Sequence, residues 1–151
     1  MSYYSEVRYL VAGKEEVMTA MLAAWRLHDE DAAEQLGEVT ITPYREGLLL
    51  LSFHMGNARW YGSYPGVAMH KRFLWFTDNY EVEGVFIRMG ENGADIESSS
   101  YGQADHDLSQ YLYTIREVHC DINIDPADDI RRAKNGSDAL PTIPESEGAI
   151  P

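Results

Sequence analysis

The sequence predicts an α+β domain in which a mostly antiparallel sheet carries two main helices on one face, followed by a short C-terminal helix and a tail. Two observations predict this class. Segments with an apolar period of two alternate along the chain with segments whose apolar period is three to four residues. In addition, 44% of the 151 residues are hydrophobic, which is enough for one core without disulfides or metals. The expected order is β-α-β-β-α-β-β-β, and the nearest simple arrangement is a split, ferredoxin-like sheet.

The first half of the chain supplies the first helix and three of the strands. Residues 6–12 carry Val7, Tyr9 and Val11 at a period of two, which predicts a strand. Residues 14–27 repeat apolar side chains every three or four positions and predict a helix, which either ends there or continues through the polar stretch 29–35. Residues 39–42 and 48–53 are rich in β-branched or apolar residues and flank a glycine turn, so they predict a hairpin.

The second half repeats this alternation of elements. Residues 67–76 are rich in large apolar groups and predict the second main helix. Residues 85–89 and 95–100 flank a glycine-rich turn and predict another hairpin. Residues 111–124 favour a long strand by their period-two pattern, but a helical stripe also fits the start of this segment, so helix and strand both remain open for 106–117.

A change of composition near residue 125 sets the expected domain boundary. Asp125 and Pro126 form a typical helix start, because aspartate caps the first amides and proline suits the first position. The residues after the following Asn-Gly pair are rich in proline and acids and contain no aromatics. We therefore expect a single domain over residues 1–125, and a short helix with a flexible acidic tail over 126–151.

Charge is the strongest guide to the class of partner. The chain has 25 Asp and Glu against 12 Lys and Arg, a formal charge of −13. Such a surface is repelled by nucleic acid backbones and by anionic membranes, so direct binding to either is not expected. One cysteine, no signal-peptide pattern and no apolar run of membrane-spanning length predict a soluble protein of a reducing cytoplasm.

The acids gather in two stretches that contain no base. Residues 89–115 hold five acids, and residues 29–38 hold five more. The first set, which we take as the candidate partner-binding surface, comprises Glu91, Asp95, Glu97, Asp105 and Asp107. Acidic patches steer basic partners and imitate a row of phosphates, although ordinary solubility explains any single patch equally simply.

Aromatic residues beside charge are the second candidate for partner binding. Arg59, Trp60 and Tyr61 follow one another in an expected loop, and interfaces are enriched in such residues. Burial in the core is an equally good interpretation of this trio. Trp25 and Trp75 lie within expected helices and are predicted to be core anchors.

No standard catalytic, nucleotide-binding or zinc motif is present in the sequence, and no cofactor or metal is predicted. The one alternative is a divalent-metal site built from an acid and histidine cluster, since carboxylates and imidazoles are suitable ligands. Its candidate members are Asp95, Glu97, Asp105, His106, Asp107, His119 and Asp121. Cys120 is predicted to be a small core residue rather than a nucleophile.

Several short pieces resemble a loose group of small acidic proteins from bacteriophages and other mobile elements. They are Met-Ser-Tyr-Tyr-Ser-Glu-Val at residues 1–7, Arg-Trp-Tyr at 59–61 followed by Tyr-Pro-Gly-Val at 64–67, residues 86–92 running into 95–97, and the strand 113–122. The resemblance covers most of residues 1–124. It implies a mobile-element origin and an α+β fold, and it carries over no activity and no catalytic residues.

These observations predict a non-enzymatic binding protein of the bacterial cytoplasm. It would inhibit a host defence protein, such as a CRISPR or restriction component, or another nucleic-acid-binding protein, by occupying a basic surface. One alternative is an immunity protein that neutralises a basic toxin, and another is a metal-dependent enzyme that uses the acid and histidine cluster between residues 95 and 121. Assembly through a homo-oligomeric interface is a further alternative.

Overall fold

The structure is a computed structural model that describes residues 3–92 and 95–110. The chain divides after His106 into two units, and the description below concerns the first of them. Of the second unit, residues 107–110 are described, and 108–110 are helical. The elements of the first unit are β1 (Ser5–Lys14), α1 (Glu15–His28), α2 (Ala32–Leu36), β2 (Thr40–Arg45), β3 (Leu48–Ala58), α3 (Pro65–Thr77), β4 (Val82–Gly90) and β5 (Ile96–Tyr101).

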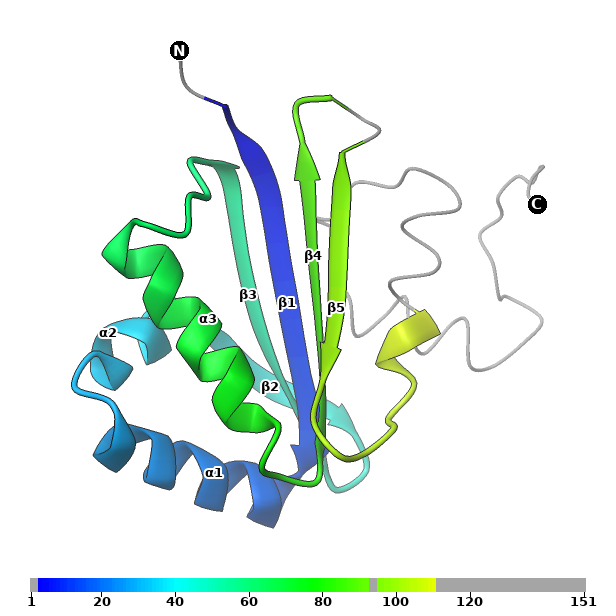
Figure 1. Cartoon of the computed structure of the whole chain (residues 1–151). Coiled ribbons are helices and arrows are strands. Elements are labelled where there is room, and N and C mark those ends of the chain that lie inside the picture. Colours follow the sequence, from blue (N-terminus) through cyan, green and yellow to red (C-terminus); the bar gives the residue numbers. More distant parts are fainter. Residues whose placement is uncertain (1–2, 93–94, 111–151) are drawn as a thin grey trace, which may run out of the picture. The chain divides into compact units, whose positions relative to one another are not determined.

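The five strands form one antiparallel sheet in the order β2-β3-β1-β4-β5, with the helices packed against one face (Figure 1). This confirms the predicted α+β class. The strands β1 to β4 with their two crossover connections also follow the split, ferredoxin-like arrangement, and β5 extends the sheet. The expected strand 111–124, the expected C-terminal helix and the tail lie outside the described residues. Within the described part of the chain, no helix is long and apolar enough to cross a membrane.

The strand β1 is the centre of the sheet and the base of the core. In the register of the sheet, Tyr9 lies opposite Phe53 of β3 on one side and opposite Phe86 of β4 on the other. All three rings are buried on the face that the helices cover, and the rings of Tyr9 and Phe53 stack with centroids 4.9 Å apart. Large side chains at matched positions of three neighbouring strands thus form the floor on which the helices pack.

The helix predicted over residues 14–27 is observed as α1, and it does not continue through the acidic stretch. Asp29 leaves the helical conformation, with φ −131° and ψ 128°. Its carboxylate accepts a hydrogen bond of 2.9 Å from the backbone N–H of Asp31. This side-chain bond offers the backbone an alternative to the helix, and the chain then forms the five-residue helix α2, which carries the buried Gln35.

The helix α3 begins with Pro65 at its first position and buries Met69 and Phe73 against the sheet. The prediction for Trp25 is confirmed, because this side chain is fully buried. The prediction for Trp75 is wrong, because this side chain is 65% exposed. Residues two positions apart point about 200° apart around a helix, so Trp75 faces away from the side on which Phe73 is buried.

Candidate functional site

The acidic turn between β4 and β5 contains an internal cation, Arg88, that pairs with two of its acids. Arg88 lies directly opposite Glu97 in the sheet register, and its Nε donates to Glu97 Oε1 at 2.9 Å. The same guanidinium bonds Asp95 Oδ1 at 2.9 Å and Ser5 Oγ at 3.1 Å. Arg88, together with a hydrogen bond from Tyr3, holds the pKa of Asp95 below its usual range. Two of the five predicted partner-binding acids are therefore already paired with a cation.

Of the other three predicted acids, Glu91 and Asp105 lie at opposite ends of the β4–β5 hairpin. Glu91 is exposed at the turn. Asp105 precedes His106, whose backbone N–H bonds the Glu83 carboxylate at 2.6 Å, at the far end of β4 from Arg88. Glu83 and Arg88 are five residues apart along β4, a distance of about 17 Å. Asp107 is the first residue of the second unit.

The same separation bears on the metal alternative. Asp95 and Glu97 lie at one end of the β4–β5 hairpin, and His106 lies at the other end. No group of three or more His, Cys, Asp or Glu side chains that could hold a metal ion occurs within residues 3–92 and 95–110. The remaining candidates, His119 and Asp121, lie outside the described residues, as does Cys120.

The second predicted group, Arg59 to Tyr61, lies in the loop between β3 and α3. Tyr61 Oη accepts a hydrogen bond of 2.8 Å from the backbone N–H of Tyr3, and Tyr3 Oη in turn donates to Asp95 Oδ2 at 2.7 Å. Arg59 lies over the ring of Tyr4 and donates to its hydroxyl at 3.2 Å. The two N-terminal tyrosines thus connect this loop to the acidic turn, which brings part of the two predicted groups together.

Trp60 resolves the choice between surface and core. Its ring is partly buried against the core and lies about 6 Å, centroid to centroid, from the rings of Phe53, His70 and Phe86. It also forms a wall of a hollow of about 420 Å³ that is open to solvent. We call this the aromatic hollow, and its lining residues are Glu38, Met55, Arg59, Trp60, Tyr64, Pro65, Gly66, Val67 and His70.

The lining of the aromatic hollow is mostly apolar, and Glu38, Arg59 and His70 are its acidic, basic and imidazole side chains. Met55 and Tyr64 line it and each exposes more than a third of its surface. Arg59 is held at Tyr4, and Glu38 is held by His70. Binding pockets of small molecules and of inserted side chains have this character and fall in the range of about 300–1,000 Å³.

A chain of buried hydrogen bonds runs from the core to the edge of this hollow, and chemistry fixes its direction. The Trp25 indole N–H can only donate, so Gln35 Oε1 accepts at 2.9 Å and Gln35 Nε2 donates to Tyr9 Oη at 3.0 Å. The ionised Glu38 carboxylate can only accept, so His70 Nε2 carries a hydrogen and donates to Glu38 Oε1 at 2.7 Å. In a neutral His70 ring Nδ1 is then unprotonated, and it accepts from the Tyr9 hydroxyl at 2.7 Å.

Burial of this chain governs the protonation of its members. Burial lowers the pKa of His70 below its ordinary value, although Glu38 opposes this shift. Burial also raises the pKa of Tyr9. Because both ring nitrogens of His70 are occupied and the ring is 2% exposed, His70 offers no free nitrogen to a molecule in the hollow.

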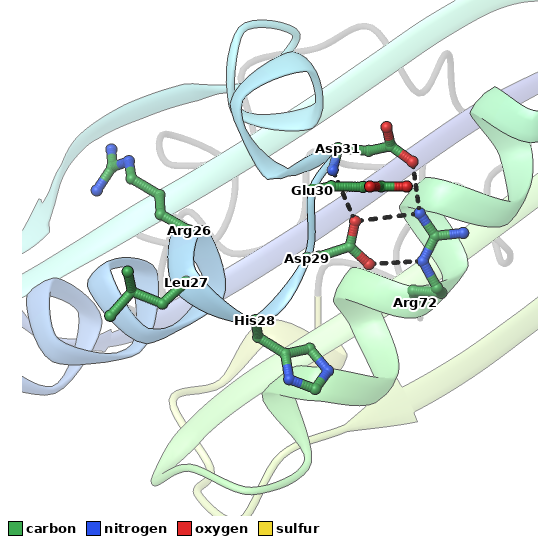
Figure 2. A pocket seen from close by; sticks show the side chains of 7 residues that line it. All are labelled: Arg26, Leu27, His28, Asp29, Glu30, Asp31 and Arg72. Carbon is green, nitrogen blue, oxygen red and sulfur yellow. Dashed lines mark hydrogen bonds and ion pairs between the residues drawn. The ribbon is translucent and has the colours of Figure 1, made fainter.

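A second hollow lies where α1 ends, lined by Arg26, Leu27, His28, Asp29, Glu30, Asp31 and Arg72. In Figure 2 the carboxylates of Asp29 and Asp31 face the guanidinium of Arg72, with contacts of 2.6 and 2.9 Å, whereas Leu27 points away. Arg72 holds the pKa of Asp29 below its usual range. The charges that line this hollow are thus largely paired with one another, and Leu27 is left 91% exposed beside them.

Sequence reasoning missed His70, Gln35 and Glu38, which support the aromatic hollow. One signal was present: His70 lies three residues before Phe73 and seven before Thr77, on the apolar side of its helix. A polar residue on that side needs a buried partner. The partners come from β1 and from the end of α2, which the pattern of α3 cannot identify.

Comparisons with protein-family models, with curated proteins and with solved structures found no match to this chain.

Proposed function

We propose that the chain is a non-enzymatic binding protein that occupies a basic surface of a nucleic-acid-binding protein, with the aromatic hollow receiving an apolar side chain of that partner. The aromatic hollow carries this proposal, because it combines exposed Met55 and Tyr64 with the acid Glu38 in its lining. Interface hot spots are typically large apolar or aromatic contacts of this kind, surrounded by a polar rim.

The acidic side of the hollow supplies the preference for a basic partner. Glu38 lines it, and Glu34 acts electrostatically on His70, which lines it as well. Glu34 is exposed and forms no ion pair within the part of the chain that the structure describes. In this proposal Glu34 and Glu38 meet Lys and Arg side chains that otherwise hold phosphates, so affinity should fall as salt rises.

The acidic turn takes a smaller part in this proposal than the sequence predicted. Arg88 already pairs with Asp95 and Glu97, so a partner's cations would compete with an internal one. Glu91 remains available as an exposed acid at the turn. The resemblance to mobile-element proteins suggests the partner class, a CRISPR or restriction component in the cytoplasm of a bacterial host.

The proposal is tested with a panel of purified DNA-binding proteins: CRISPR effector complexes, restriction endonucleases and cationic nuclease toxins. Fluorescence anisotropy of labelled DNA reports whether the chain displaces DNA from each of them. We expect the protein to displace DNA from at least one member of the panel. Its affinity for that member should weaken by about tenfold or more between low and physiological salt. If DNA is displaced from none of the members, the proposal is contradicted for these classes. Displacement only from a toxin would favour an immunity protein.

A pair of aromatic substitutions in this protein tests whether the partner binds at the aromatic hollow. Tyr64→Ala, at the hollow, should weaken displacement by about tenfold, as truncation of an interface anchor does. Trp75→Ala is the matched control. It removes an exposed ring from α3, the helix that Tyr64 precedes, at a position away from the hollow. A loss caused by Trp75→Ala with Tyr64→Ala unaffected would place the interface elsewhere and overturn this use of the hollow.

A further inference from the structure

The hydrogen-bond chain from Trp25 to Glu38 joins four separate elements of the fold. Trp25 belongs to α1, Gln35 to α2, Tyr9 to β1 and His70 to α3. Glu38 follows α2 and lines the aromatic hollow. A change at one bond therefore acts on how α3 and the hollow are held to the central strand.

The contact between Tyr9 Oη and His70 Nδ1 has room for one hydrogen, and a charged His70 would put a second hydrogen there. A second proton on His70 would go to Nδ1, toward which the Tyr9 hydroxyl already points its own hydrogen. Tyr9 cannot pass that hydrogen to Gln35, because Gln35 itself donates to the hydroxyl. The Tyr9 hydroxyl is fully buried, so its displaced hydrogen would lose its acceptor, which is costly in an apolar interior.

Burial among aromatic rings favours the neutral form of His70, and the nearby acids oppose it. Phe53 of β3 lies 4.1 Å away, centroid to centroid, and Trp60 of the following loop lies 6.0 Å away. The charged groups that act on the ring are Glu38 and, at longer range, Glu34, and both favour protonation, while Arg59 lines the same hollow. Glu38 is 40% exposed, so water screens part of its attraction.

We propose that the hydrogen-bond chain from Trp25 to Glu38 is a pH-sensitive switch. A neutral His70 holds α3 and the aromatic hollow onto β1, and protonation of His70 releases them. The switch itself needs no partner. Its consequence for binding at the hollow rests on the proposed function, and the experiment below reads the switch without a partner so that the two can fail separately.

The first test is a histidine-resolved NMR titration of the native protein. We expect His70 to be neutral with its hydrogen on Nε2 at neutral pH, and to titrate below the ordinary histidine value of about 6.5. A hydrogen on Nδ1, or titration at or above that value, would overturn the proposal. This measurement needs no substitution, so it stands even where a variant folds poorly.

The second test is amide hydrogen exchange, corrected for the intrinsic rate, at about pH 7.5 and about pH 5. Protection of α3 should fall by about tenfold across this range, and protection of β1 and β4 should stay within about twofold. Unchanged protection in α3 while His70 titrates, or an equal loss in all elements, would contradict a local release.

Two variants separate the switch from a general effect of acid. Tyr9→Phe removes the hydroxyl that competes with the second proton, so the pKa of His70 should rise relative to the native protein and the pH effect on α3 should shrink. His54→Asn changes a histidine of β3 that bonds Glu6 and is not a member of this hydrogen-bond chain, so it should leave both quantities unchanged. An unchanged His70 pKa in Tyr9→Phe would show that the hydrogen-bond direction does not control it.

Discussion

The two acidic stretches of this chain look alike in sequence and differ in the folded molecule. In the β4–β5 turn, Arg88 bonds both Asp95 and Glu97 and is only 16% exposed. In the stretch between α1 and β2, Arg72 reaches across from α3 to bond Asp29 and Asp31. The acids that remain exposed there without an ion pair among the described residues are Glu30 and Glu34.

The comparison shows that a base-free stretch of sequence is not an uncompensated surface. Arg88 stands one residue before the stretch 89–115, and the antiparallel register places it opposite Glu97. Arg72 is 41 residues from Asp31, and only the packing of α3 beside the end of α1 brings them together. We infer that the stretch between α1 and β2 leaves two acids available to a partner, Glu30 and Glu34, against one at the turn, Glu91.

Removing Arg88 should have the largest effect on stability. Arg88→Met leaves Asp95 and Glu97 facing each other without a cation and breaks the bond to Ser5. We expect a loss of about 2 kcal/mol in the free energy of unfolding, measured by urea titration, because a mostly buried, multiply bonded charge is lost. A loss no greater than that of Arg72→Met would break the comparison.

Removing Arg72 should cost less, about 1 kcal/mol, because Arg72 is 41% exposed and water screens its ion pairs. The pKa of Asp29 is lowered in the folded protein, so the pair stabilises the fold above the unfolded value of about 3.8 and this contribution is lost as pH falls through the lower folded pKa. The difference between native protein and Arg72→Met should therefore vanish in strong acid. A difference that persists there would show that lost packing, not charge, is responsible.

The pH dependence of the native protein sharpens the account of His70. The folded pKa of His70 is lowered, so its contribution to stability is fully present above about pH 6.5 and is lost as pH falls from there through the folded pKa. We expect the free energy of unfolding to decrease as pH falls across this window, read from urea unfolding at several pH values. Stability that is constant or rising over the same window would contradict a neutral, buried His70.

The smallest effect is expected from Glu34→Gln. This side chain is exposed and forms no ion pair within the described residues, so the free energy of unfolding should change by less than about 0.5 kcal/mol. Its substitution should nevertheless weaken partner binding if the acids beside the hollow are used. Glu15→Gln is the matched control, since it removes one exposed acid from the first turn of α1.

The class and order of the elements could be predicted because they depend on local patterns. The apolar periods of α1 and α3 follow their buried faces, and turn residues mark most boundaries, whereas β1 and the first six residues of β4 are buried at nearly every position, which their period of two does not predict. The site could be predicted only in part. The sequence pointed to Arg59 and Trp60, which line the hollow, but the partners of Arg88, Arg72 and His70 depend on strand register and helix packing, which linear spacing does not contain.

The placement of available acidic charge can be measured directly by NMR titration with a short arginine-rich peptide. The backbone amides of the first unit report where a cationic chain settles, without any knowledge of the natural partner. We predict the largest shifts at Glu34, Glu38 and the start of α3 around Gly66, and small shifts at Glu91 and Glu97. Larger shifts at Glu91 and Glu97 than at Glu34 and Glu38 would contradict the account.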